Sequence, residues 1–215
     1  MIKPTSHMIA TALLAVGGLT ACSAGGSQPG AGPAPQVSAD RPVLPYAAPD
    51  AEFMVGMIHH HSQALEMARL VPTHGAAPSL RTLAERIDVG QRDEIVLMQR
   101  WLRDRGLPVP DAEAHAGHDM PGMDHSELMP GMLTPQQMAQ LDAARGPEFD
   151  RLFLTFMIQH HQGALTMVDK LFGSQGATQD ETVFRMASDA YADQSTEIKR
   201  MQTMLDALPS GEHRP

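Results

Sequence analysis

Phe53-x-x-x-Met57-Ile58-His59-His60-His61-x-x-Ala64-Leu65-x-Met67 is the stretch that decides the fold, because the chain carries it twice. The second copy reads Phe153-x-x-x-Met157-Ile158-Gln159-His160-His161-x-x-Ala164-Leu165-x-Met167. A related partner segment follows each copy, at residues 91–102 and 194–205, with Gln, Glu, Ile and Met at the same spacing. The chain therefore contains two copies of a helical hairpin. One hairpin cannot bury its apolar face alone, so the two are expected to form an all-α four-helix bundle.

Capping residues and prolines predict the ends of the helices in the first half of this bundle. The first helix is expected to run from Asp50, as its N-cap, to about Val71. The second is expected from near Pro78 to the residues before Gly106. Repeat one thus spans residues 50–106.

The connecting segment, residues 108–146, is broken by proline and glycine but should contain a short extra helix. Thr134-Pro135-Gln136-Gln137 is a capping box with proline at the first helical position. Repeat two, residues 147–208, holds a helix that ends near Gly173 and a last helix that begins at a second capping box, Thr178-Gln179-Asp180-Glu181. The bundle domain as a whole is expected over residues 50–208.

The first 21 residues have the features of a secretory signal. Lys3 precedes an apolar run, residues 8–19, that is too short for a stable membrane span. Leu19-Thr20-Ala21-Cys22 resembles a lipobox, which implies that Cys22 is diacylated and becomes the N-terminus. The alternative is an ordinary signal peptide followed by a chance cysteine. Residues 22–49 are rich in Gly, Ala, Pro and Ser and are expected to form a flexible tether between lipid and domain, outside the cytoplasm.

Charge and cysteine content exclude several classes of function. The chain has 16 basic and 25 acidic residues, and Lys3 is the one charged residue of the signal, so the mature chain has a formal net charge of −10. Nucleic-acid binding needs a basic surface and is not expected. Cys22 is the only cysteine, so zinc and iron–sulfur sites made of thiolates are excluded.

The two His-His pairs predict a polar layer inside the bundle. Helical spacing places each pair on an otherwise apolar stripe, with Met57 and Met157 one turn before the histidines. The partner helices carry polar residues on their apolar stripes at mid-length, where antiparallel helices meet. The candidate ligands are His60, His61, His160, His161, Met57, Met157, Met67 and Met167, with Glu94, Glu197, Gln91 and Gln194 expected to hold the second ring nitrogens.

This layer has two interpretations. It is either a closed set of hydrogen bonds, which buried polar groups require, or a metal site built from imidazole and thioether. The duplicated His-His motif with a flanking methionine favours the metal site. Methionine at helical spacing is more often packing than ligand, so Met67 and Met167 carry less weight. His74, in a turn, is expected to be solvated.

The connector supplies a second group of candidate ligands. Met-Pro-Gly-Met occurs twice in it, at residues 120–123 and 129–132. A flexible segment has no core for methionines to fill, and thioether sulfur suits Cu(I), while neutral imidazole also suits Cu(II). Zinc would favour fewer methionines, and chance composition of a surface loop is the alternative. The candidates here are His115, His118, Met120, Met123 and His125.

The doubled Met-Ile-x-His-His-x-x-Ala motif and the two Gln-x-x-Glu-Ile-x-x-Met segments resemble the exported proteins grouped as domain of unknown function 305 (DUF305), over about residues 50–208. The resemblance implies a ferritin-like four-helix bundle and kinship with CopM-type periplasmic copper-binding proteins, which support copper tolerance. Ferritin-like di-iron enzymes use Glu-x-x-His pairs, and this sequence has none, so di-iron chemistry is not expected.

The leading hypothesis is thus a membrane-anchored extracytoplasmic lipoprotein that binds copper for sequestration, for tolerance, or for transfer to or from another protein. Catalysis is not required by any motif. The alternatives are a copper-dependent oxidase, which would need an open coordination position, and a structural or interaction protein whose His–Glu layer only stabilises the bundle.

Overall fold

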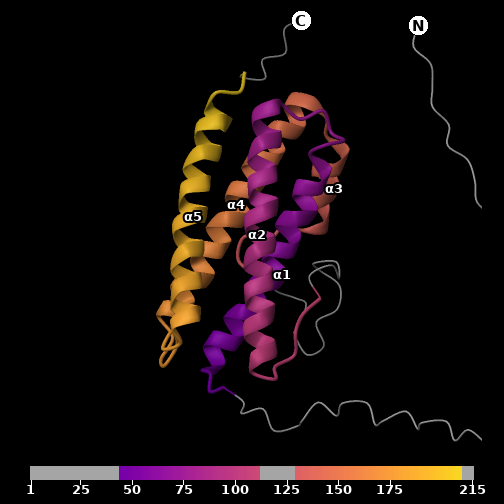
Figure 1. The fold of residues 1–215 in the computed structure, drawn as a ribbon. Helices are drawn as coiled ribbons and strands as arrows, with labels where there is room; N and C mark the ends of the chain where they lie inside the picture. Colours follow the sequence, from indigo (N-terminus) through magenta and orange to yellow (C-terminus); the bar gives the residue numbers. More distant parts are fainter. Residues whose placement is uncertain (1–43, 112–128, 210–215) are drawn as a thin grey trace, which may run out of the picture. The chain divides into compact units, whose positions relative to one another are not determined.

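The computed structural model describes residues 44–111 and 129–209, and within them the chain is all-helical, which confirms the predicted fold class. The described residues form five helices, shown in Figure 1: α1 Ala48–Leu70, α2 Pro78–Asp104, α3 Pro135–Ala143, α4 Gly146–Phe172 and α5 Glu181–Asp206. The proposed signal peptide, Cys22, most of the tether and the histidine-rich part of the connector lie outside the described residues. Among the described helices, none combines the length and the hydropathy that a membrane span requires.

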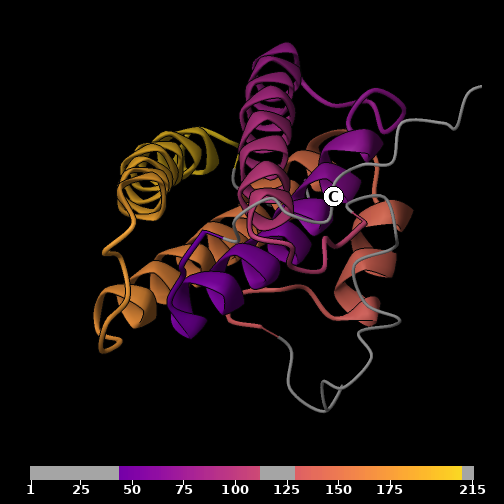
Figure 2. The ribbon, with the colours of Figure 1, turned by 60° about the horizontal axis from the view of Figure 1, so that its bottom comes forward.

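Each repeat forms a helical hairpin, and the two hairpins meet through their first helices. α1 packs on α2, α4 packs on α5, and α1 and α4 pack against each other at the centre, while the short α3 contacts both of them. Figure 2 shows α2 and α5 on one side of the α1–α4 pair and α3 near its other side. Within the described residues α2 and α5 make at most a few contacts with each other. The ferritin-like arrangement in particular stays a prediction.

Two clusters of buried apolar side chains form the core, and the histidines stand between them. On α1 one cluster holds the buried apolar residues from Phe53 to Ile58 together with Leu65, and the other holds Ala64, Met67 and Ala68. On α4 the second cluster comes first, with residues from Phe149 to Ile158, and the first cluster follows from Ala164. The reversal follows from the antiparallel packing of α1 and α4. Both His-His pairs therefore lie at the middle of the molecule, where burial on each side excludes water.

Asp50 and Asp150 tie each hairpin to the other. The prediction that Asp50 caps its own helix is wrong, because α1 begins one turn earlier, with Ala47 as N-cap. The buried Asp50 carboxylate instead accepts a hydrogen bond from the Thr178 amide at 2.8 Å, in the turn of the second hairpin. Asp150 accepts one from the Ala77 amide at 3.2 Å, in the turn of the first. The same position of the repeat is used twice, so the hairpins are locked reciprocally.

The predicted capping box is confirmed at the start of α3, but the predicted start of α5 is wrong by three residues. The capping box at Thr134 is confirmed, with Thr134 Oγ1 accepting from the Gln137 amide and the Gln137 side chain from the Thr134 amide. The last helix begins at Glu181 rather than at Thr178, because Asp180 is the N-cap and Thr178 has a left-handed backbone with φ of 57°.

His74 is buried rather than solvated. Only 4% of its surface is exposed, and its ring packs on Phe149 with centroids 4.8 Å apart. Its Nε2–H donates to the Asp142 carbonyl at 2.9 Å, which ties the α1–α2 turn to the end of α3. A histidine in a turn is buried here because the connector folds over that turn.

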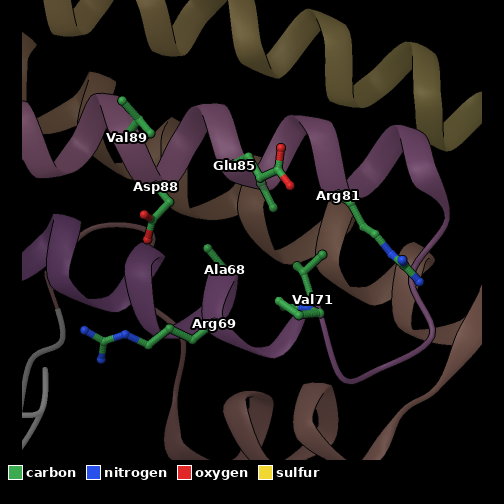
Figure 3. A pocket seen from close by; sticks show the side chains of 9 residues that line it. Ala68, Arg69, Val71, Arg81, Glu85, Asp88 and Val89 are labelled. Atoms are coloured by element: carbon green, nitrogen blue, oxygen red, sulfur yellow. The ribbon is translucent and has the colours of Figure 1, made fainter. Parts of the chain in front are cut away.

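A hollow of about 600 Å³ lies on the described surface between α1 and α2. Figure 3 shows Ala68, Arg69 and Val71 on the side of α1, facing Arg81, Glu85 and Asp88 on α2. None of the predicted ligands within the described residues lines this hollow, so it is separate from the histidine layer.

Candidate metal centre

The four histidines of the repeated motif lie together in the core. His60, His61, His160 and His161 have no exposed surface. The His60 and His160 rings come from α1 and α4, and their centroids are 3.8 Å apart. Each lies next to the second histidine of its own pair, with ring centroids 6.5 Å apart on α1 and 6.2 Å apart on α4. The crossing of α1 and α4 therefore brings the two copies of the motif into one layer.

Glutamates from the outer helices hold the second histidine of each pair. The Nε2 of His61 is hydrogen bonded to Glu94 Oε2, and His161 Nε2 is bonded to Glu197 Oε2 at 2.7 Å. A carboxylate can only accept, so in both rings the proton lies on Nε2. When such a ring is neutral, its Nδ1 carries a lone pair. Glutamate thus sets the tautomer, as outer carboxylates do around histidine-bound metals.

The connector does the same for His60. Its Nε2–H donates to the Pro130 carbonyl at 3.0 Å, which leaves Nδ1 of this ring unprotonated when it is neutral. Pro130 belongs to the second Met-Pro-Gly-Met sequence. None of the predicted ligands belongs to this second sequence, and its backbone contact to His60 could not be predicted from residue types.

Several ring nitrogens in this layer have no hydrogen-bond partner among the described residues. They are Nδ1 of His60, His61 and His161, and both Nδ1 and Nε2 of His160. Buried polar atoms in folded proteins are nearly always paired, and each unpaired one costs on the order of 1–3 kcal/mol. The unpaired nitrogens belong to histidines of two helices, α1 and α4, and lie in one buried layer. The chemistry of this donor set fits a metal ion that accepts imidazole nitrogen.

Burial keeps the central rings in the form that binds metal. Burial, and after it the adjacent His61, lowers the pKa of His60 to about 3. Burial also lowers the pKa of His160 well below its ordinary value, with His60 as the next cause. Both rings are therefore neutral at physiological pH, and a metal does not have to displace a proton from them.

Met57, Met157 and Met67 are all buried members of the two apolar clusters. Met57 and Met157 also lie one turn before the histidines on the same helices, so helical spacing places each of them next to both rings of its own pair. Met67 lies further along α1 than the histidines and packs as a core residue. Met167 lies beside Gly56, where a Cβ atom would be 3.3 Å from Met167 Cε and 3.6 Å from Met129 Sδ.

The connector is fixed to the helices by contacts that need glycine. Gly131 has φ of 76°, and a Cβ atom on Gly163 would lie 1.9 Å from the Pro130 carbonyl oxygen. Gln63 on α1 binds the same segment of the connector. Its amide nitrogen donates to the Leu133 carbonyl, and its side-chain oxygen accepts from the Leu133 amide at 2.7 Å. The carbonyl that holds His60 is thereby placed by backbone packing.

Gln91 and Gln194 line a groove between α2 and α5 instead of bonding to the histidines. Neither side-chain oxygen has a hydrogen-bond partner. The groove measures about 230 Å³, and Glu94, Glu197 and Asp193 line it as well. Burial raises the pKa of Asp193, and the nearby Glu94 and Glu197 raise it further. The expected contact between these glutamines and the ring nitrogens is absent from the structure.

The predicted ligands of the connector, His115, His118, Met120, Met123 and His125, lie outside the described residues. Among the described ones, no three His, Cys, Asp or Glu side chains are grouped so that they could hold a metal ion as they stand. The histidine layer therefore offers nitrogen donors whose rings must turn, or whose partners must include methionine sulfur, before an ion is bound.

Comparison with solved structures gives relatives with the same fold. A DUF305 fragment from Deinococcus radiodurans is 28% identical, with a TM-score of 0.64, and covers 77% of this chain and 100% of its own. A DUF305 protein from Streptomyces coelicolor, described as a candidate secreted protein, is 28% identical with a TM-score of 0.63, covering 78% and 98%. CopM in its Cu(II)-bound form is 30% identical with a TM-score of 0.58, covering 73% and 95%. CopM is also known in Cu(I)-bound and Ag-bound forms.

The comparison with curated proteins gives no match. Residues 50–205 match the family described as "Domain of unknown function (DUF305)", which confirms the resemblance drawn from the repeated motif. Since this match spans nearly all of the helical part, the protein belongs to the DUF305 family.

Proposed function

We propose that this protein is an extracytoplasmic lipoprotein that binds copper for sequestration or transfer. One observation carries the proposal: four fully buried imidazoles meet in one layer, and five of their nitrogens have no hydrogen-bond partner. A purely structural histidine layer would pair these atoms, because leaving them unpaired destabilises the fold.

In this proposal the metal is held by ring nitrogens of the histidine pairs, with Met57 and Met157 as soft sulfur ligands. Glu94 and Glu197 keep the Nε2 protons in place and leave Nδ1 of His61 and His161 to the metal. Imidazole with thioether favours Cu(I), and imidazole alone also accepts Cu(II). The likeness to CopM, which binds Cu(I), Cu(II) and silver, supports the same choice of metal.

The histidines and methionines of residues 115–125 would form a second group of ligands that collects the ion or passes it on. Cys22, as the lipidated N-terminus, would anchor the protein to a membrane through the tether of residues 22–49. The similarity to a candidate secreted protein supports a location outside the cytoplasm. A copper-donating or copper-accepting protein would then be the partner.

A structural role is the second candidate, and a specific observation favours it. The His60 and His160 rings are stacked closely, and His60 is already bonded to the connector. In that case the layer would only fix how the two hairpins pack. The proposals differ in whether the four imidazoles contribute to metal affinity.

The test is a competition titration of the mature protein against a coloured Cu(I) chelator. We expect binding tighter than micromolar, and a loss of at least about 100-fold when His60, His61, His160 and His161 are all replaced by Gln. His59→Gln is the matched control, because the second repeat carries Gln159 at that position. A variant with Ser at residues 115, 118, 120, 123 and 125 separates the layer from the connector. Unchanged affinity in a folded quadruple variant would refute the histidine-layer site.

A further inference from the structure

The groove between α2 and α5 is the feature that the proposed metal centre leaves unexplained. It measures about 230 Å³ and is lined by matching residues of the two repeats, Gln91 with Gln194 and Glu94 with Glu197. Asp193 lines it on α5, and the equivalent residue on α2 is Gly90, where a Cβ atom would meet nothing within 4 Å. The groove is therefore roomy and polar.

The groove reaches the histidine layer through two side chains. Glu94 and Glu197 line it, and the same carboxylates bond to His61 and His161. About one fifth of each glutamate side chain is exposed, at 21% and 18%, whereas the histidines are fully buried. The opposite approach, toward His60, is covered by the Pro130 backbone. Glu94 thus lies between the groove and His61, and Glu197 lies between the groove and His161.

Two buried amides at the groove point to a polar occupant. Gln91 and Gln194 are only 5% and 4% exposed, yet both amide atoms of Gln91 and the oxygen of Gln194 have no hydrogen-bond partner. Buried amides without partners are costly, and they stand at equivalent positions in the two repeats, so we infer that a polar ligand pairs with them in the groove. Three carboxylates against the single guanidinium of Arg86 make the lining negative. Oxygen donors and negative charge suit a hydrated divalent cation.

We propose that this groove is the route by which hydrated Cu²⁺ reaches and leaves the histidine layer, held on the way by the carboxylates of Asp193, Glu94 and Glu197 and the amides of Gln91 and Gln194. This inference rests on the proposed function. Hard oxygen ligands hold the ion with its water, and the softer imidazoles then take it over. A route is used both when the ion enters and when it leaves. Substitutions along it should therefore change the association and dissociation rates of Cu²⁺ alike and leave Kd nearly unchanged.

The test is stopped-flow mixing of the apoprotein with aqueous Cu²⁺, followed by quenching of Trp101, the only tryptophan. Asp193→Asn is expected to lower the association rate by about threefold to tenfold and to weaken its dependence on salt. Gly90→Asp, which restores the symmetry of the repeats, is expected to raise the rate by a similar factor. In both variants Kd, measured separately by titration, should change by less than the rate.

Two controls match these substitutions. Asp169→Asn removes the same charge from an exposed position on α4 that does not line the groove. Gly90→Ala adds the Cβ atom and the helix propensity without the charge. Rates in Asp193→Asn and Gly90→Asp that equal those of their controls would overturn the route. A drop in affinity with an unchanged association rate would also overturn it. Absence of Cu²⁺ binding by the unaltered protein would instead refute the proposed function.

Discussion

At the scale of single residues, the chemistry of the layer depends on which nitrogen of each imidazole holds its proton. Three of the rings donate a hydrogen bond through Nε2–H, and the acceptors are Glu94, Glu197 and the Pro130 carbonyl. In each of these rings the nitrogen without that contact is Nδ1. Two of the three partners come from equivalent positions in the repeats. The third, the Pro130 carbonyl, comes from the connector and bonds to His60. His160, the equivalent histidine of the second repeat, has no such partner among the described residues.

Replacing Glu94 and Glu197 by Gln tests this tautomer control. The amide keeps the shape of the carboxylate but not its charge, and it no longer requires a proton on Nε2. We expect Cu(I) affinity to fall by about 10-fold to 100-fold, as it does when outer carboxylates of histidine metal sites are removed. Chelator competition measures the change, with the exposed Glu85→Gln on the same helix as control. Equal affinity in the double variant and the control would contradict the assignment.

The acid stability of the apoprotein follows from the low pKa values of His60 and His160. Below pH 6.5 the unfolded chain takes up protons on these residues that the folded protein does not, because burial lowers both pKa values. Stability is therefore full above pH 6.5 and is lost as the pH falls toward the folded pKa of about 3 for His60. At pH 5.5 the loss is about 1.4 kcal/mol for each imidazole relative to pH 7.5.

Urea unfolding of the metal-free protein at pH 7.5 and 5.5 measures this loss. His160→Gln removes one titrating group, so the variant should lose less stability between the two pH values, by about 1.4 kcal/mol. His60 and His59, whose pKa values burial also lowers, still contribute in the variant. A variant that loses as much as the unaltered protein would show that other groups cause the acid sensitivity.

At the scale of the elements, the differences between the repeats mark where the connector docks. Gly163 stands where the first repeat has Gln63, and both touch the segment from Pro130 to Leu133. Gln159 stands where the first repeat has His59, and its side chain donates to the Gly131 carbonyl. The histidine pairing could be predicted from the repeated motif. The docking could not, because periodicity reports the shared face of two helices and not the irregular segment that crosses them.

Gly163→Ala and Gly90→Ala make a matched pair that tests this docking. Both replace glycine within a helix, which normally stabilises by about 0.5–1 kcal/mol. At Gly90 that gain is expected, since nothing lies within 4 Å. At Gly163 the new Cβ would collide with the Pro130 carbonyl, and we expect a loss of about 1–3 kcal/mol instead. Denaturant unfolding of the two variants measures the difference, and the same sign in both would contradict the close approach.

At the scale of the whole molecule, the hairpins complete each other. α1 and α4 share the core, and Asp50 and Asp150 each bond to the turn of the opposite hairpin. The sequence predicted that two hairpins are needed to bury one apolar face. It could not predict the reciprocal aspartates, because an Asp near the start of a helix is usually its own cap.

Residues 44–111 and 129–209, produced separately, should therefore lack a cooperative thermal transition in far-UV circular dichroism. Each piece leaves its half of the histidine layer and of both apolar clusters exposed to water. Mixing the two pieces in equal amounts should restore a transition. A single piece that melts cooperatively near the temperature of the intact protein would contradict the shared core.

The central claim is that the metal lies between α1 and α4, among the four buried imidazoles. Diffraction from crystals of the Cu(I)-loaded protein, with anomalous differences collected at the copper edge, tests it most directly. We expect a copper peak bonded to at least one ring nitrogen from each helix, with the Nδ1 atoms of His61 or His161 among the ligands. Copper peaks confined to the connector or the surface, with the His60 and His160 rings still stacked, would contradict it.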